Sequence, residues 1–515
     1  MATFLQYRAI GQRVKRQLDH TLQDGSCPFP LEDMEQQTEI DTPNSRRVLI
    51  VGWDGPDDDG NPRNWATGQK WLATILVSLL ALLVGVCAPI EAPIRQLAMH
   101  EFSISEMVES LSVALFLAGM GVGALVSGPF SEVLGRSGTY AVTLLSMCIW
   151  LMASALSPHI VPRLLFRFMA GFSGAAPLVC SGGTISDLWA PKDRIYPFLF
   201  FTVVGFGTPA LGPVFSAWIS NSSQHHMWRW AEWIALIFSA TVLLVLVAFQ
   251  PETYAPVLLS WKAKHLREMT GDQGYHAQHE LEDLALPHRL KMACIRPFTM
   301  AWNELTIKLA SLYLSFVYAV LFTFFDGYPI LFQATYGLSH EMTFVLLAGI
   351  SLGAVCSAVL GPIVHRKVLH ETKQTNQGTL HVNPAGRLWF AMLAAPGLPV
   401  SLFWMGWTAF PTVSIWSPLA ASLLFGYSIT GIFIGISMYV IDVYAQFAAS
   451  AMAFTYLARY LAAAAMTVAG IPLYENLGGH WTLTLLGCIS IILTPLPYVF
   501  FKFNHALHHK SAGMA

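Results

Sequence analysis

The sequence predicts an all-α membrane protein with about twelve transmembrane helices. Of its 515 residues, 54% are hydrophobic and 12% are charged, whereas soluble domains average about a quarter charged residues. Its apolar runs are roughly 20 residues long, the length that a helix needs to cross a hydrocarbon core about 30 Å thick. Helices satisfy their own backbone hydrogen bonds, as lipid requires.

The apolar runs fall into two groups of six. They cover roughly residues 71–92, 107–127, 138–158, 164–184, 195–219, 230–249, 310–334, 343–364, 388–408, 415–438, 448–470 and 481–501. This grouping predicts two pseudo-symmetric six-helix bundles. The expected organisation is a cytosolic N-terminal tail (1–70), an N-terminal bundle (71–250), a cytosolic linker (251–309), a C-terminal bundle (310–501) and a cytosolic C-terminal tail (502–515).

The positions of the basic residues predict the orientation. Most of the 29 Lys and Arg residues fall in the tails, the linker and alternate loops, and short cytosolic loops accumulate such residues. Both termini are therefore expected in the cytosol, and the linker is expected to form amphipathic helices. The polar stretch before the first span, which includes DGPDDDGNPRNW, is expected to be disordered or loosely docked.

Charge and cysteine usage exclude several classes of function. A net charge of −2 offers no basic surface for a nucleic-acid backbone. The cysteines are scattered singly, without zinc spacing or the density of a disulfide scaffold, so neither a metal nor a cofactor is expected. The first 20 residues are interrupted by Arg and Lys and do not resemble a signal peptide. Asn221-Ser222-Ser223 matches a glycosylation acceptor in a predicted outer loop.

The loop between the second and third spans reads GPFSEVLGRSG, from Gly128 to Gly138. It resembles the signature loop of the major facilitator superfamily. Gly128 would let a helix of the other half approach closely. Glu132, Arg136 and Asp187 are expected to form a gating latch on the cytosolic side, with Arg136 bonded to Asp187.

The fourth and fifth spans carry two further candidate features. Arg167 opens the fourth span, where an unpaired guanidinium is costly, so it should face the bundle interior. The resemblance links this arginine to proton transfer; snorkelling to the outer interface is the alternative. Gly212-Pro213 in GTPALGPVFSAW should kink the fifth span. This string is similar to the antiporter motif of the superfamily, although Thr208, Ser216 and Ala217 stand where glycines are expected.

Four more strings extend the resemblance over nearly the whole chain from about residue 60. They are PETYAPVLL (251–259), RPFTMAWNEL (296–305), LYLSFVYAVLFTFFDGYPILF (312–332) and YVIDVYAQFAASAMAFTYLARY (439–460). Together they resemble the fungal twelve-span drug:proton antiporters, which export drugs, polyamines and metabolites. The resemblance implies the major facilitator fold, alternating access, a monomer in the plasma membrane, and protons and a small organic molecule as partners.

Ionisable groups within the spans are the candidates for proton coupling. We expect Asp326, beside Gly327 and Pro329 in a locally broken helix, to exchange protons, with Arg167 of the other bundle as its partner. The alternative is an interfacial acid that only caps the helix. Weaker candidates are Glu91, Asp442 and Arg459, of which Asp442 and Arg459 are expected to be structural first. Glu304, before the seventh span, is expected to cap a helix or bind the linker. Several aromatic residues are expected to line an apolar substrate cavity: Phe116, Phe206, Tyr313, Tyr318, Phe322 and Tyr328.

Other functions are compatible with parts of the sequence. His505, His508 and His509 match one histidine box of di-iron lipid desaturases, but partner boxes are missing from suitable positions, so no enzyme is predicted. A non-transporting sensor would be expected to carry longer soluble tails. Within transport, proton symport or facilitated uptake remains the alternative to export. The substrate itself is not predicted by any motif.

Overall fold

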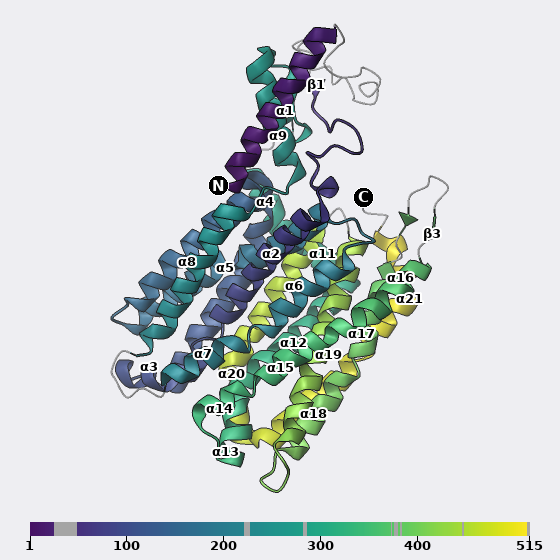
Figure 1. Cartoon of the computed structure of the whole chain (residues 1–515). Helices are drawn as coiled ribbons and strands as arrows, with labels where there is room; N and C mark the ends of the chain where they lie inside the picture. Colours follow the sequence, from purple (N-terminus) through teal and green to yellow (C-terminus); the bar gives the residue numbers. More distant parts are fainter. Residues whose placement is uncertain are drawn as a thin grey trace.

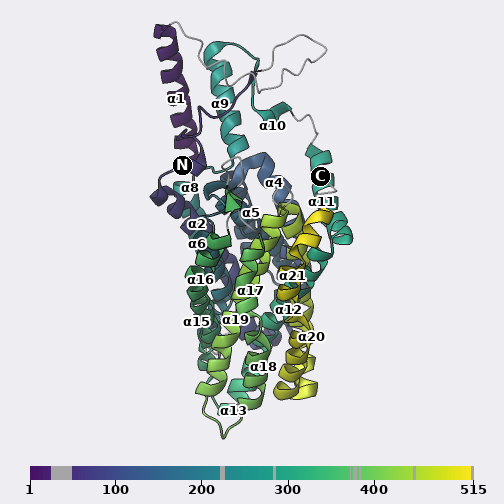
Figure 2. The same cartoon turned by 90° about the vertical axis from the view of Figure 1, so that its right-hand side faces the viewer.

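The computed structural model describes residues 1–24, 49–220, 227–281, 286–371, 373–374, 380–381, 384–444 and 448–511. Within these residues, ten helical stretches are long and apolar enough to cross a membrane. The predicted class of an all-α membrane protein is confirmed. The helices run side by side in an elongated bundle (Figures 1 and 2).

The N-terminal bundle runs from α2 to α8. Its helices are α2 (Thr67–Cys87), η3 (Ala92–Ile94), α3 (Arg95–Phe102), α4 (Glu106–Ala155), α5 (Ile160–Leu188), α6 (Ile195–Gly207), α7 (Leu211–Ser220) and α8 (Arg229–Phe249). A short turn, η2 (Pro62–Asn64), precedes it. The connection to the second bundle contains α9 (Ala255–Thr270), α10 (Gln278–Leu281) and α11 (Leu286–Asn303), in the region where amphipathic helices were predicted.

The C-terminal bundle runs from α12 to α21. Its helices are α12 (Leu305–Tyr328), η4 (Pro329–Gln333), α13 (Ala334–Tyr336), α14 (His340–Val345), α15 (Ala348–Cys356), η5 (Ser357–Val359), α16 (Leu360–Glu371), η6 (Pro384–Leu388), α17 (Trp389–Ala394), α18 (Gly397–Thr408), α19 (Trp416–Val443), α20 (Ala448–Leu493) and α21 (Leu496–Ser511). A small hairpin, β3 (Lys373–Gln374) with β4 (Leu380–His381), follows α16.

Two long helices each cover two of the predicted spans. Helix α4 turns at Gly135 (φ 78°) and α20 turns at Gly478 (φ 75°), and glycine adopts this left-handed conformation without a side-chain clash. The ten stretches therefore account for all twelve predicted apolar runs.

The two ends of the bundle are distinguishable (Figure 1). The N and C labels lie at one end, here called the terminal end, where α1 (Ala2–Asp24) and α9 project beyond the bundle. Helices α3, α13 and α14 lie at the opposite, distal end.

The N-terminal tail differs from its prediction. Instead of a loose polar segment throughout, residues 2–24 form α1, which packs on α9. Ile10, Val14 and Leu18 recur every four residues and give the helix one apolar face. That face meets Ala263 and Leu266 of α9. Nearby, β1 (Leu49–Ile50) pairs in parallel with β2 (Tyr275–His276), so the tail is tied to the linker.

Small residues bring the helices of the N-terminal bundle close together. A Cβ atom at Gly119, Gly123 or Gly171 would collide with backbone carbonyl groups of the facing helix, so α4 and α5 are in backbone contact. Between the bundles, Gly121 of α4 lies against α20: a Cβ there would be 3.3 Å from the Leu457 oxygen. The central helices of the two bundles therefore touch without a layer of large side chains between them.

Candidate functional site

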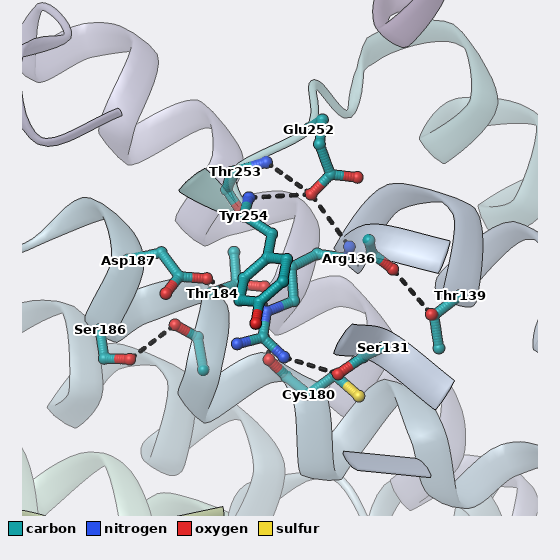
Figure 3. A network of polar contacts seen from close by, with 12 residues as sticks. Ser131, Arg136, Thr139, Cys180, Thr184, Ser186, Asp187, Glu252, Thr253 and Tyr254 are labelled. Carbon is teal, nitrogen blue, oxygen red and sulfur yellow. Dashed lines mark hydrogen bonds and ion pairs between the residues drawn. The ribbon is translucent and has the colours of Figure 1, made fainter. Parts of the chain in front are cut away.

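A polar network surrounds Arg136 at the terminal end of the N-terminal bundle (Figure 3). Its Nε lies 3.1 Å from Asp187 Oδ2, and its Nη1 donates to Ser131 Oγ at 2.7 Å. The guanidinium also lies 4.9 Å from the centre of the Tyr254 ring. The structure thus brings Arg136 and Asp187 together, as the sequence predicted.

The second acid of this network is Glu252, which the sequence analysis did not single out. Its carboxylate accepts hydrogen bonds from the backbone N–H groups of Arg136 (2.9 Å), Ser137 (3.1 Å), Thr253 and Tyr254 (both 2.9 Å). Burial raises the pKa of Glu252, and the four N–H groups oppose that rise. The available signal was an acid directly after the sixth span, in the string PETYAP.

Two predicted members of the latch lie elsewhere. Glu132 is exposed and makes none of the contacts described for Arg136 and Glu252. Gly128 has no atom within 4 Å of the position of a Cβ, so the expected close approach of the other bundle is wrong for this residue. Instead Gly183 makes room for the Arg136 side chain: a Cβ there would be 2.7 Å from Nη2.

Arg167 belongs to a buried cluster within the N-terminal bundle, the N-bundle cluster. It comprises Arg163, Arg167, Glu91, Glu109 and Glu232, and each of these residues is at most 2% exposed. Arg163 Nη2 lies 2.9 Å from Glu91, and its Nη1 lies 2.9 Å from Glu109. Arg167 lies 3.4 Å from Glu91 and 3.7 Å from Glu232. Arg167 therefore faces the bundle interior, as predicted, and does not snorkel.

The N-bundle cluster has more acids than bases. Three carboxylates face two guanidinium groups, so full ionisation would leave an excess negative charge in a water-poor interior, which is costly. Glu232 is the least neutralised of the three. Its Oε1 accepts a hydrogen bond from Ser154 (2.8 Å), but its buried Oε2 has no hydrogen-bond donor. Glu109 and Glu232 lie inside predicted spans, so the search for intramembrane charges could have found them.

Asp326 pairs with Arg95 and not with Arg167, which corrects the predicted partner. Asp326 Oδ1 lies 2.6 Å from Arg95 Nη2, so the pair joins α12 to α3. Arg167 instead contacts Glu232 on α8 and Glu91, which follows α2 in the sequence. The helix also does not break after Asp326: it continues as a π-turn over Pro329–Gln333.

Both ends of the bundle interface are bridged. At the distal end, two polar contacts connect the bundles. One is the Arg95–Asp326 pair, and the other is a 3.0 Å contact between His340 Nε2 and the Pro93 oxygen. At the terminal end, Arg387 Nη2 donates to the Pro191 oxygen (2.6 Å). Asp442 binds both Arg387 (2.8 Å) and Arg194 (3.5 Å). Asp442 therefore takes part in the contacts between the two bundles.

A small cavity of about 40 Å³ lies between the two bundles, enough for a few water molecules. Of the six predicted aromatic residues, Phe206, Tyr318 and Phe322 line it. The other three pack away from it. Phe116 lies under Arg167, Tyr313 is buried within the C-terminal bundle, and the Tyr328 hydroxyl donates to Ser422. Arg459, first read as structural, also lines the cavity.

The remaining predicted residues are placed as follows. The fifth span is interrupted between α6 and α7 at residues 208–210, immediately before Gly212 and Pro213. Gly212 lies against the Val86 carbonyl, where a Cβ would collide. Glu304 accepts a hydrogen bond from the Tyr444 hydroxyl (3.0 Å). Asn221 and the side chains of His505, His508 and His509 lie outside the described residues.

The family model of the Major Facilitator Superfamily matches residues 71–467. The chain belongs to the Major Facilitator Superfamily. It is 43% identical to the MFS-type transporter kojT of Aspergillus flavus over 495 residues. This match covers 95% of this chain and 87% of the relative. It is also 33% identical over 458 residues to the ascochitine biosynthesis cluster MFS transporter of Didymella fabae, with coverage of 88% and 87%.

Solved structures show the same fold. The proton:xylose symporter XylE bound to 6-bromo-6-deoxy-D-glucose superposes with a TM-score of 0.62 at 14% identity, covering 85% of this chain and 97% of the other. The human organic anion transporter MFSD10 superposes with a TM-score of 0.58 at 18% identity, covering 83% and 99%. As a member of this superfamily, with a transporter relative at 43% identity, the protein is a multi-pass transporter of small solutes and not an enzyme.

Proposed function

We propose that the protein is a proton-coupled exporter of a small organic molecule, of the fungal drug:proton antiporter type. The observation that carries proton coupling is the acid excess of the buried N-bundle cluster. An interior site with three carboxylates and two guanidinium groups favours the binding of one proton. Glu232, whose Oε2 has no donor, is the proposed proton carrier, and Arg167 is the charge that competes with the proton.

The N-bundle cluster is positioned to respond to a solute. Arg167 Nη2 lies 3.4 Å from the carbonyl oxygens of Cys87 and Ala88, and Ala88 lines the central cavity. Movement of the end of α2 on solute binding would shift Arg167 relative to Glu232. A closer Arg167 would release the proton, and a more distant one would favour its uptake.

Alternating access would use the two bridged ends as gates. The Arg95–Asp326 pair is the proposed outer gate, and the contacts of Arg194 and Arg387 with Asp442 and Pro191 are the proposed cytosolic gate. Arg136, Asp187 and Glu252 are proposed to form the latch of the N-terminal bundle. This assignment revises the earlier expectation for Asp326 from proton exchange to gating.

Export from the cytosol across the plasma membrane, with both termini cytosolic, is the proposed direction and location. Support comes from the distribution of basic residues and from the name of the ascochitine cluster relative, which places that protein beside a biosynthetic pathway. The unit that carries out transport is proposed to be a monomer, since the gates and the cavity lie within one chain.

The test begins with metabolite profiling of a knockout strain, inside and outside the cell. Export predicts that one solute accumulates inside the knockout and is depleted in its medium. That solute is then measured in proteoliposomes with an imposed pH gradient. Wild-type protein should concentrate it against its own gradient. Glu232→Gln should allow only downhill movement, while Glu101→Gln, which changes an acid outside the cluster, should behave as wild type. Depletion of a solute inside the knockout would contradict export, and uphill transport by Glu232→Gln would contradict the assigned carrier.

A further inference from the structure

The central cavity contains a buried cation without a carboxylate partner. Arg459 of α20 is 3% exposed and lines the cavity. Its Nε and Nη1 have no hydrogen-bond partner, and no acid pairs with it among the residues that the structure describes. Three other arginines of the described membrane interior differ in this respect. Each of them contacts at least one carboxylate: Arg95, Arg163 and Arg167.

Four aromatic rings surround this guanidinium. Its central carbon lies 4.5 Å from the centre of the Tyr318 ring, 4.9 Å from Phe433, 4.6 Å from Tyr456 and 4.7 Å from Tyr460. Ring faces stabilise the charge by cation–π attraction. The ring faces accept no conventional hydrogen bonds, however, so Nε and Nη1 remain unsatisfied in a low-dielectric site.

The two walls of the cavity differ in chemistry. The C-terminal bundle contributes Arg459 and the Tyr460 hydroxyl, which also lacks a partner. The N-terminal bundle contributes mainly apolar surface, including Ala88, Leu117 and Phe206. A solute held between them would place a flat apolar face on the N-terminal wall and oxygen acceptors on the C-terminal wall.

We propose that Arg459 is the recognition residue for small, flat organic anions whose carboxylate or enolate oxygens accept hydrogen bonds from Nε and Nη1. Guanidinium groups bind such paired oxygens in a bidentate geometry, and the aromatic cage fits a conjugated ring system. The cavity of about 40 Å³ is the closed form of this site, which must widen to admit the solute. This inference rests on the proposed transport function and specifies its substrate class.

The test measures equilibrium binding to purified protein in lipid nanodiscs. The probes are aromatic and heteroaromatic acids such as benzoate and nicotinate, each compared with its amide and with the corresponding amine. Acids should bind to wild-type protein in preference to amides and amines. Arg459→Gln should weaken acid binding about ten- to a hundred-fold, the loss expected for a charge-assisted hydrogen-bonded pair. Arg459→Lys should retain part of the affinity, because it keeps the charge but not the fork.

Controls separate recognition from folding. Lys308→Gln removes an exposed cation of α12 outside the cavity and should leave binding unchanged. Tyr460→Phe, which removes only the unpartnered hydroxyl, should weaken acid binding to a smaller degree than Arg459→Gln. Preferential binding of amines, no binding of any acid at millimolar concentration, or unchanged acid binding by Arg459→Gln in a monodisperse preparation would each overturn the inference.

Binding and transport distinguish this inference from the proposed function. Acid binding that depends on Arg459, without solute movement in proteoliposomes, would contradict the exporter assignment alone. Proton-driven transport that does not depend on Arg459 would contradict the substrate class alone.

Discussion

Arg95 and Asp326 lie 2.6 Å apart across the distal boundary between the two bundles, and both side chains are at most 10% exposed. Such a buried pair makes the closed distal end sensitive to the loss of either charge, because the remaining charge is left unpaired. Removing one partner of a buried pair typically costs about 3–5 kcal/mol, enough to shift a two-state equilibrium by more than about a hundred-fold.

Asp326→Asn should therefore open the distal end. Spin labels on cysteines that replace Met107 and Met342, both exposed near that end, report the separation of the bundles. The variant should move most molecules to a longer distance than wild type. Asp442→Asn, which breaks the pairs at the terminal end, should not lengthen this distance. Identical distributions for Asp326→Asn and wild type would exclude the pair as a gate.

Glu252 and Glu132 form a matched pair of acids near Arg136, one inside the polar network and one outside it. Glu252→Gln should lower the transport rate at least about ten-fold at unchanged membrane abundance, since charged acceptors of backbone N–H groups are worth about 1.5–3 kcal/mol. Glu132→Gln should transport at the wild-type rate. Arg136→Ala should resemble Glu252→Gln. Equal rates for the two glutamate variants would remove Glu252 from the latch.

Arg163 holds two of the three acids of the N-bundle cluster. Arg163→Met should lower the melting temperature of the purified protein by several degrees, because Glu91 and Glu109 lose their nearest cation. Adding Glu109→Gln should restore part of the loss, since one unpaired acid is removed. A double variant no more stable than Arg163→Met would argue that the pairs do not act together.

The α1–α9 contact should protect the N-terminal helix from proteolysis. Val14 is buried against α9, whereas Leu5 on the same helix is 56% exposed. Val14→Asp buries an unpaired charge at a cost of more than about 2 kcal/mol, so trypsin should cleave within α1 sooner. Leu5→Asp should be cleaved at the wild-type rate. Equal cleavage of both variants would show that α1 is not held by this apolar face.

The fold was predictable because lipid restricts the chain to helices whose length follows from composition. Every predicted apolar run overlaps a helical stretch. The helix of residues 2–24 was missed, because its apolar face of Ile10, Val14 and Leu18 is short and is stabilised by α9, which lies more than 200 residues away in the sequence.

The sequence predicted several of the charged residues of the site, but it predicted less well which of them contact one another. Arg136 with Asp187 follows from a local turn and a neighbouring helix. The partner of Asp326 depends on where α3 lies after the first span, a tertiary detail that no local pattern contains. Arg459 was read as structural because its unpartnered donors and its four rings become visible only when α12, α19 and α20 are packed.

The most direct test of proton coupling through Glu232 is to measure whether purified protein releases protons when its solute binds. The protein is placed in weakly buffered detergent solution near neutral pH, and the solute identified by metabolite profiling is added while a dye reports the pH. The account predicts a solute-dependent release that approaches one proton per molecule for wild-type protein and is absent for Glu232→Gln. Solute binding without proton release by the wild type, or equal release by the variant, would contradict it.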